Sequence, residues 1–332
     1  MPRSATQTGP VADRRRRRCA AAVLVALIAA LMTWAPMTGT AHGASSAGLL
    51  PRSVDPSSEA IREFLTPDAR RIQSSDWLLG MWKIAQLHAA PPDIPVVCLL
   101  GGSSARECTV GDAEWADEIA SLGGPEVITI NLGSRNQTFG QDLQIVKNLP
   151  KSVPSIVFIG VNQGRYNLGQ MDSRVRLPEA SSSQPPSTQH HYSSKKIYSL
   201  ATKRALVGAW MKTAYPKFRS RYSANFAILE QVVKKCKERG LHPVLVDLPR
   251  LTAVIGHAWD APIRRYHKGC WTLKSKYQVP FYNFVQASGF VPKDFFDLVH
   301  LVEPGRAKFQ EQLSKTAISL LKKYNMVPAA GS

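Results

Sequence analysis

Short apolar runs alternate with helical patterns along most of the chain. Runs of strand length occupy Ile94 to Leu100, Glu126 to Leu132, Ser155 to Val161, His242 to Leu248 and Phe281 to Val285. Helical patterns cover residues 113–122, 140–149 and 224–239, and a long closing helix is expected over 303–324. Continuous apolar strands separated by helices are typical of a parallel sheet that is covered on both faces. The pattern therefore predicts an α/β fold, a three-layer doubly wound sandwich with a mainly parallel sheet of about five strands.

The first 43 residues differ from this pattern. Arg14 to Arg18 form a basic run, the 17 residues from Cys19 to Ala35 are almost wholly apolar, and small residues follow as far as Ala44. This order is typical of a secretory signal peptide, and the apolar stretch is also at the short limit for a membrane anchor. Residues 1–43 are therefore expected to direct the rest of the chain out of the cytoplasm, either as a cleaved signal or as an anchor.

The remainder divides into a helical lead-in over residues 44–92 and one domain over 93–326. In the lead-in, Ser75 to His88 carries a helical stripe of apolar residues, and Pro91-Pro92 ends it. Inside the domain, about 60 residues (163–222) separate the third and fourth strands. This insertion combines a polar Pro/Ser-rich stretch with a basic, aromatic one. We expect it to overhang the sheet edge, as a substrate lid, a docking surface or a solvated loop.

Charge and cysteine content limit the classes of function. The formal net charge is +18, and residues 1–43 hold six basic residues against one acid, which leaves +13 for the rest. Such a charge favours anionic partners. Four cysteines follow the leader (Cys98, Cys108, Cys236 and Cys270). Disulfides are possible in an exported chain, although free buried thiols fit Cys98 equally well. No C-x-x-C pair or histidine spacing indicates a metal site, and no cofactor is expected.

The first strand ends abruptly at Gly101-Gly102-Ser103-Ser104, and a helix-like stretch follows. Ligands of doubly wound sheets bind at the carboxyl ends of the strands, so a serine here is either a helix cap or a nucleophile. Near the C-terminus, Asp297 and His300 stand three residues apart, just before the closing helix. A serine nucleophile needs a base, and the base needs an acid to orient it. A single D-x-x-H pair is common, however, and is weak evidence by itself.

The order of these motifs resembles the SGNH (GDSL-type) hydrolase superfamily. Gly101-Gly102-Ser103 follows the first strand, Gly160-Val161-Asn162 follows the third, and Asp297 to His300 precede the last helix. The resemblance covers residues 94–324 apart from the insertion. It implies a flavodoxin-like sheet and a hydrolase in which Ser103 is the nucleophile, His300 the base and Asp297 the acid that orients it.

The resemblance also implies the groups that would stabilise an oxyanion. These are the backbone N–H of Ser103, the side chain of Asn162 and a residue of the second block, Asn131 to Leu143. Here the chain departs from the family, because its oxyanion glycine falls on Asn136. Gly133 is the nearest glycine upstream, so both positions remain candidates; Asn tolerates positive φ better than most residues. Gly102 replaces the aspartate of the G-D-S block. Asn136-Gln137-Thr138 also matches the N-glycosylation pattern, which we interpret as accidental.

Other residues near these motifs have alternative roles. Ser104 is the rival nucleophile, although it fits the cap of the following helix better. Arg106 and Arg165 are candidates for binding an anionic group of the substrate, or are simply solvated charges.

The sequence thus predicts an extracytoplasmic serine esterase or acyl hydrolase without cofactor. The expected substrate is an O-acyl ester, and the location and charge favour an acylated cell-envelope polysaccharide; anionic lipid surfaces and small esters remain open. An acyltransferase on the same scaffold and a non-catalytic glycan-binding protein are the alternatives. Nucleic-acid binding is disfavoured, because the leader exports the chain and no recognition motif is present.

Overall fold

The computed structural model describes residues 75–169 and 190–326. All of them belong to a compact unit assigned to Ser45–Ser332. The expected leader over 1–43, most of the lead-in and most of the Pro/Ser-rich stretch lie outside the described residues. Within the described ranges, no helix is both long and apolar enough to cross a bilayer.

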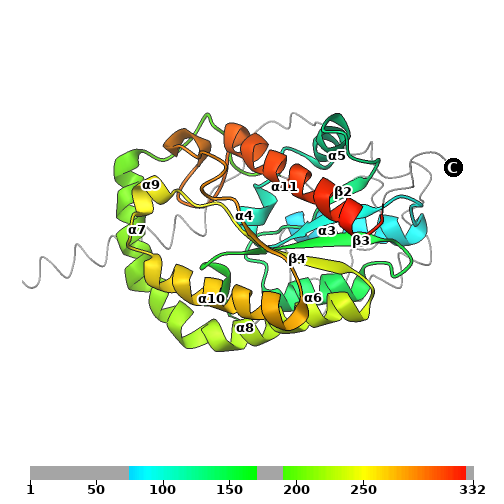
Figure 1. Ribbon diagram of the computed structural model, residues 1–332. Coiled ribbons are helices and arrows are strands. Elements are labelled where there is room, and N and C mark those ends of the chain that lie inside the picture. Colours follow the sequence, from blue (N-terminus) through cyan, green and yellow to red (C-terminus); the bar gives the residue numbers. More distant parts are fainter. Residues whose placement is uncertain (1–74, 170–189, 327–332) are drawn as a thin grey trace, which may run out of the picture. The chain divides into compact units, whose positions relative to one another are not determined.

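The centre of the fold is a parallel sheet of five strands (Figure 1). The strands are β1 (Val96–Leu100), β2 (Ile128–Asn131), β3 (Ser155–Val161), β4 (His242–Asp247) and β5 (Phe281–Asn283), in the order β2-β1-β3-β4-β5. Every pairing is parallel. This confirms the predicted fold class and strand count. The strand order reverses between β1 and β3, and in such sheets the crevice at that point is where ligands bind.

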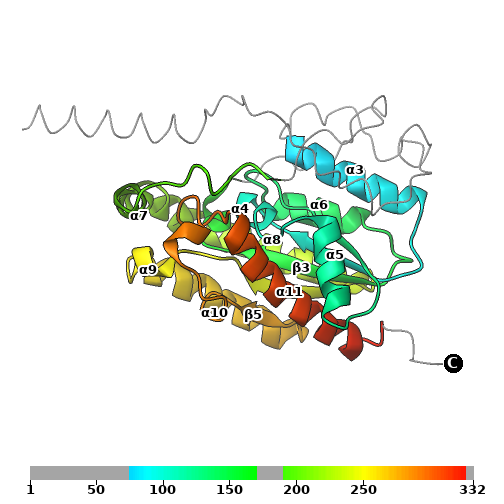
Figure 2. The ribbon, with the colours of Figure 1, turned by 90° about the horizontal axis from the view of Figure 1, so that it is seen from above.

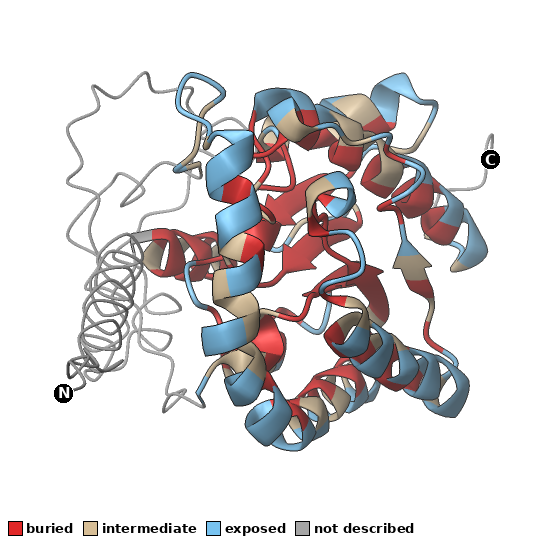
Figure 3. Ribbon diagram, turned by 90° about the vertical axis from the view of Figure 1, so that its left-hand side faces the viewer, coloured by how far each residue is buried: buried red, intermediate tan, exposed pale blue. Residues whose placement is uncertain are grey.

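Helices cover both faces of the sheet. They are α3 (Ser75–Ala89), α4 (Ser103–Arg106), α5 (Asp112–Ser121), α6 (Phe139–Asn148), α7 (Leu200–Thr213), α8 (Tyr215–Glu238), α9 (Thr252–Ile255), α10 (Asp260–Tyr277) and α11 (Glu303–Lys323), with 3₁₀ turns η3 (Arg165–Asn167) and η4 (Pro292–Asp294). Strand residues alternate between two hydrophobic clusters. Val96 and Cys98 pack with α3, α6, α8 and α10, whereas Val97 and Leu99 pack with α5 and α11. Figure 3 shows the strands buried between helices whose outer faces are exposed.

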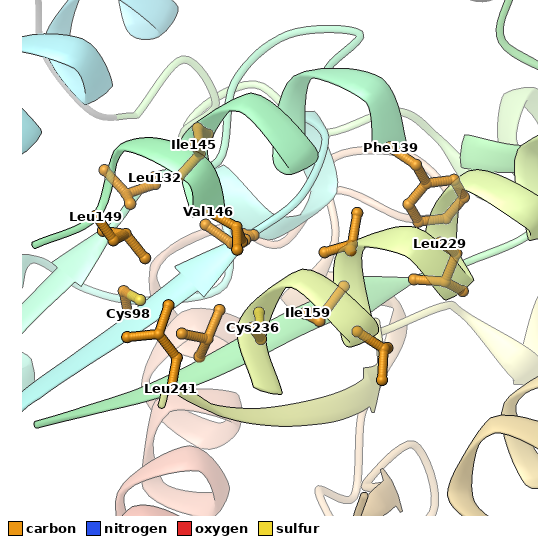
Figure 4. Close-up of a cluster of buried hydrophobic side chains, with 14 of the residues drawn as sticks. Cys98, Leu132, Phe139, Ile145, Val146, Leu149, Ile159, Leu229, Cys236 and Leu241 are labelled. Atoms are coloured by element: carbon orange, nitrogen blue, oxygen red, sulfur yellow. The ribbon is translucent and has the colours of Figure 1, made fainter. Parts of the chain in front are cut away.

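The cysteines settle one alternative left open by the sequence. Cys98, Cys108, Cys236 and Cys270 are all buried and free. Cys98 and Cys236 lie within the apolar cluster between the sheet, α6 and α8 (Figure 4). The four thiols therefore contribute as small apolar side chains, and disulfides among them are excluded.

Helix α10 was not predicted from the sequence. Its buried residues, Pro262, Tyr266, Gly269, Cys270 and Leu273, have helical spacing, but only Leu273 is a large aliphatic side chain. Gly269 is needed for close packing, because a Cβ there would lie 2.5 Å from the hydroxyl of Tyr222 on α8. The helix thus combines a buried stripe at helical spacing with close tertiary contact to α8.

The second half of the expected insertion is also more ordered than predicted. Helix α7 and the first turns of α8 occupy residues that were interpreted as an overhanging segment, and Lys203, Phe218 and Tyr222 are buried there. Residues of α7, among them Val207, pack with Leu298 of the D-x-x-H segment. Figures 1 and 2 place α7 and α9 together at one end of the sheet. The insertion therefore forms part of the framework beside this segment.

Candidate active site

The turn after β1 presents Ser103 at the carboxyl edge of the sheet. Gly101 has φ +155°, and a Cβ at this position would lie 2.6 Å from the Cβ of Ala105. A larger residue would therefore prevent α4 from beginning two residues after the strand. Ser103 is the first residue of α4 and is partly exposed, whereas Ser104 behind it is buried. The glycines thus permit a sharp strand-to-helix turn that leaves one serine accessible.

Ser103, His300 and Asp297 form one continuous chain of hydrogen bonds. Ser103 Oγ lies 2.8 Å from His300 Nε2, and His300 Nδ1 lies 2.7 Å from Asp297 Oδ2. A carboxylate oxygen only accepts, so Nδ1 carries the proton that it donates to Asp297. Nε2 of the neutral ring is then the acceptor for the Ser103 hydroxyl. The structure therefore brings Ser103 together with His300 and Asp297, although Ser103 and His300 are 197 positions apart in the chain.

The segment that carries Asp297 and His300 is a tight turn closed by its own backbone. Phe295 and Leu301 form an antiparallel bridge, and the N–H of Phe296 donates to the carbonyl of His300 at 2.8 Å. Asp297 Oδ1 accepts the backbone N–H groups of Val299 at 2.8 Å and His300 at 2.9 Å. One carboxylate therefore fixes both the turn and the orientation of the ring.

The surroundings of Asp297 keep it ionised. Burial raises its pKa, but the ring of His300 and the N–H groups of Val299 and His300 outweigh that effect, and the pKa lies below its ordinary value. An ionised Asp297 stabilises the imidazolium that forms when Nε2 accepts a proton.

Asn162, at the end of β3, directs its amide toward the nucleophile helix. Its Oδ1 accepts the backbone N–H of Arg165 at 3.0 Å, and its Nδ2 donates to Ser104 Oγ at 3.2 Å. The first contact fixes which end of the amide faces α4. The second proton of Nδ2 has no partner among the described residues, so it can meet an oxyanion. The N–H of Ser103, in the first turn of α4, also lacks an intrahelical acceptor.

The structure distinguishes the two candidates in the second block. The N–H of Gly133 donates to Asn131 Oδ1 at 2.9 Å, so it is already engaged. A Cβ on Gly133 would lie 2.4 Å from the backbone nitrogen of Arg106, and this glycine therefore serves close packing against α4. Asn136 instead has φ +54° and is exposed, and no acceptor faces its N–H within the described ranges. Of the two N–H groups, only that of Asn136 is available, and the prediction for Gly133 is wrong.

The predicted substrate-binding role of Arg106 and Arg165 is also wrong. Arg106 is buried and pairs with Asp76 at 2.7 Å and with Glu107 at 2.9 Å. Arg165 is buried against Asp142 at 2.6 Å. Both guanidinium groups are thus buried and paired with carboxylates inside the protein, and neither can meet an anionic substrate. The position of an arginine near a catalytic motif does not reveal which acidic side chains will pair with it in the folded protein.

Two buried acids near the nucleophile helix were not singled out by the sequence. Asp76 of α3 accepts from Arg106 and, through the same oxygen, from the backbone N–H of Arg135 at 2.6 Å. Asp76 lies outside the blocks that carry the resemblance, and only its place at the first turn of a predicted helix marked it. Both acids bind cations that support the site.

Glu107 is the centre of a buried ion cluster behind α4. Arg106 lies 2.9 Å and Arg306 2.5 Å from its oxygens, the N–H of His191 donates at 3.0 Å, and the His190 ring lies 3.3 Å away. Burial raises the pKa of Glu107, but the contact with His190 and the charges of Arg106 and Arg306 outweigh it and lower the pKa to about 2. The cluster ties the nucleophile helix to the start of α11 and to the insertion.

No group of three potential metal-binding side chains occurs in the described ranges. The chemistry that the arrangement supports is that of an activated hydroxyl nucleophile with a proton acceptor and nearby oxyanion donors.

No protein-family model matches the sequence, and a search of curated proteins finds no match. Among solved structures, the chain is similar to a lipase/acylhydrolase from Enterococcus faecalis (14% identity, TM-score 0.39, covering 70% of this chain and 97% of that one). It is also similar to a G-D-S-L family lipolytic protein from Veillonella parvula (12%, 0.40, 66% and 96%) and to a family 3 carbohydrate esterase from Talaromyces cellulolyticus (14%, 0.40, 69% and 99%).

Proposed function

We propose that the protein is a serine esterase that transfers the acyl group of an O-acyl ester to water through Ser103. The observation that carries this proposal is the unbroken relay from Ser103 Oγ through His300 to Asp297. The relay leads from a partly exposed hydroxyl to a partly buried, ionised acid, as nucleophilic catalysis requires.

The first half of the reaction forms an acyl-enzyme. Ser103 Oγ attacks the ester carbonyl carbon while His300 Nε2 takes the hydroxyl proton. The carbonyl oxygen becomes an oxyanion that accepts from the N–H groups of Ser103 and Asn136 and from Asn162 Nδ2. As the intermediate collapses, the C–O bond to the alcohol breaks, and the imidazolium of His300 returns its proton to the leaving oxygen.

The second half removes the acyl group. A water molecule takes the place of the alcohol beside His300, which accepts its proton as the water oxygen attacks the acyl carbon. The C–O bond to Ser103 then breaks, and Ser103 Oγ recovers its proton from His300. Asp297 stays ionised throughout and stabilises the imidazolium in both halves.

The substrate class is inferred from charge and from the expected location. Residues 200–280 contain 16 lysines and arginines against four acids, so nearly all the positive charge beyond the leader lies there. Lys217, Arg219 and Lys234 on α8 and Lys268 on α10 are exposed. A basic surface of this kind attracts anionic polymers, which supports an O-acylated, anionic cell-envelope glycan as the substrate. The signal-like leader supports action outside the cytoplasm.

The test is ester hydrolysis by the full-length protein and two variants. We expect turnover of 4-nitrophenyl acetate by the wild type and a loss of at least about a thousandfold in kcat for Ser103→Ala and for His300→Ala. If folded Ser103→Ala protein still hydrolysed 4-nitrophenyl acetate at the wild-type rate, the proposal would be wrong. Product analysis with and without an added glycan distinguishes the alternatives: acylated glycan would indicate a transferase, whereas glycan binding without turnover would indicate a binding protein.

A further inference from the structure

We propose that Tyr192, Phe296 and Tyr198 form a subsite for the sugar ring on the alcohol side of the ester. This inference rests on the proposed function and names the part of the substrate that lies beyond the scissile bond. Nothing in the sequence motifs pointed to it, because the three residues come from two segments about 100 positions apart in the chain.

The three rings and the ring of His300 form a continuous row. Tyr192 stacks on Phe296 with centroids 4.4 Å apart and planes inclined by 22°. Tyr198 lies on Phe296 at 4.5 Å, and Tyr192 lies 4.8 Å from the His300 ring. The order is therefore Tyr198, Phe296, Tyr192 and His300, with Ser103 Oγ beyond Nε2 of His300.

The position of this row of aromatic rings determines which part of a bound ester it would contact. His300 returns its proton to the oxygen of the leaving alcohol, so groups bonded to that oxygen lie on the histidine side of the site. The acyl group instead lies beside Ser103 and the oxyanion donors. A row of rings that begins at His300 and leads away from it thus borders the alcohol portion of the substrate.

The chemistry of the row suits a carbohydrate ring. All three residues are partly exposed, and neither phenol oxygen has a partner among the described residues, nor is it sealed from solvent. Aromatic faces pack against the C–H face of a pyranose, and tyrosine adds a polar edge for its hydroxyl groups. Burial and the charge of Asp297 raise the pKa of Tyr192 to about 12, so its phenol remains a neutral donor near pH 7.

The row is held in place before any substrate arrives. The N–H of Tyr198 donates to the carbonyl of Phe296 at 2.9 Å, and Arg306 Nη2 donates to the carbonyl of Tyr192. One turn into α7, the buried Lys203 donates to the carbonyls of Pro292 at 2.8 Å and Phe295 at 2.7 Å. These bonds attach the insertion to the Asp297–His300 turn, and a rigid surface of this kind binds with less loss of conformational entropy.

The experiment compares two acetate esters that differ only in the alcohol. Glucose pentaacetate is the sugar ester, and ethyl acetate is the small ester. In full-length protein, Tyr198→Ala is expected to lower the ratio of kcat/KM for the sugar ester to that for ethyl acetate by about fivefold or more, mainly through KM. Tyr198→Phe keeps the ring and should restore most of the ratio. Trp271→Ala removes an exposed aromatic ring on α10 and should leave the ratio unchanged.

Three results would overturn the inference. The ratio in Tyr198→Ala protein could equal that of the wild type, or could fall equally in Trp271→Ala protein. The defect could instead grow with acyl chain length across ethyl acetate, butyrate and octanoate, which would assign the row to the acyl group. The proposed function survives each of these results, because wild-type turnover of ethyl acetate is measured separately. Absence of all wild-type turnover would remove both.

Discussion

The carboxylate of Asp76 accepts the backbone N–H of Arg135 at 2.6 Å. The same oxygen binds Arg106 of the nucleophile helix at 2.7 Å, and Asn136, the candidate oxyanion donor, follows Arg135 directly. One side chain of α3 therefore links the two segments that carry Ser103 and Asn136. This link makes Asp76 a positioning residue for the oxyanion donor, because it holds the peptide between Ser134 and Arg135, which directly precedes the peptide that carries the N–H of Asn136.

Replacement of Asp76 should therefore affect kcat more than KM. We expect Asp76→Ala to lower kcat about tenfold, since a donor displaced from its ideal position loses part of its effect in the transition state. Asp76→Asn retains an acceptor for the N–H of Arg135 and should recover part of kcat. The measurements are kcat and KM for 4-nitrophenyl acetate, with thermal unfolding as the control for folding. An unchanged kcat in folded Asp76→Ala protein would assign Asp76 to stability alone.

Asn162 and Ser104 should differ strongly, although they are hydrogen-bonded to each other. Asn162→Ala removes a donor aimed at the developing negative charge, and the expected loss in kcat is about 10²- to 10³-fold. Ser104 is buried and only accepts from Asn162, so Ser104→Ala should change kcat by less than about fivefold. Steady-state kinetics on both variants tests the difference. A larger loss of kcat in Ser104→Ala than in Asn162→Ala protein would contradict this prediction and would assign the larger catalytic contribution to the Ser104 hydroxyl.

Asn136 should act through its backbone rather than its side chain. Its φ of +54° lies in the left-handed region, where glycine is unstrained and β-branched residues are disfavoured. Asn136→Gly should therefore keep both kcat and stability, whereas Asn136→Val should lose about 1 kcal/mol or more of unfolding free energy and part of kcat. Denaturant unfolding and kinetics provide both readouts. Loss of kcat in Asn136→Gly protein would instead indicate a role for the carboxamide.

The buried Glu107 should make stability fall in acid. Its pKa is lowered from about 4.5 to about 2, so between these values the unfolded chain binds a proton that the folded protein does not. The stabilisation, on the order of 3 kcal/mol, is therefore present above about pH 5 and is lost as the pH falls toward 2. We expect Glu107→Gln to be less stable than the wild type at pH 7 and to show a smaller further loss at pH 3.5. Urea unfolding at both pH values tests this, and equal acid losses in the two proteins would contradict it.

The fold was accessible from the sequence because its strands are buried on both faces. Continuous runs such as Ser155–Val161 and turn residues such as Gly101 are local signals, and they located all five strands. The relay residues were accessible for a related reason: their motifs lie directly at strand ends and before α11. Helix α10 was missed because its buried residues depend on distant partners, Gly269 packing against α8 and Tyr266 against Tyr166 and Asp247, which no local pattern reports.

The incorrect site assignments share one physical cause. Arg106 and Arg165 look like free cations in the sequence, but Asp76 and Asp142 neutralise them across distances of 23 to 30 residues. Gly133 looked like a donor, yet Asn131 occupies its N–H. Likewise, Tyr192 reaches His300 from a segment with no motif. Pairings that form only in the fold, between distant segments for the arginines and Tyr192 and within one turn for Gly133, decide these roles, and residue type and spacing do not encode them.

The most direct test of the account is covalent labelling of the full-length protein with a fluorophosphonate, followed by peptide mass spectrometry. We expect one adduct on Ser103, which is absent in the Ser103→Ala variant and forms much more slowly in the His300→Ala variant. The Ser104→Ala variant should be labelled as the wild type is. An adduct on Ser104, or no adduct on a folded wild-type protein that also fails to hydrolyse 4-nitrophenyl acetate, would contradict the central claim that Ser103 is an activated nucleophile.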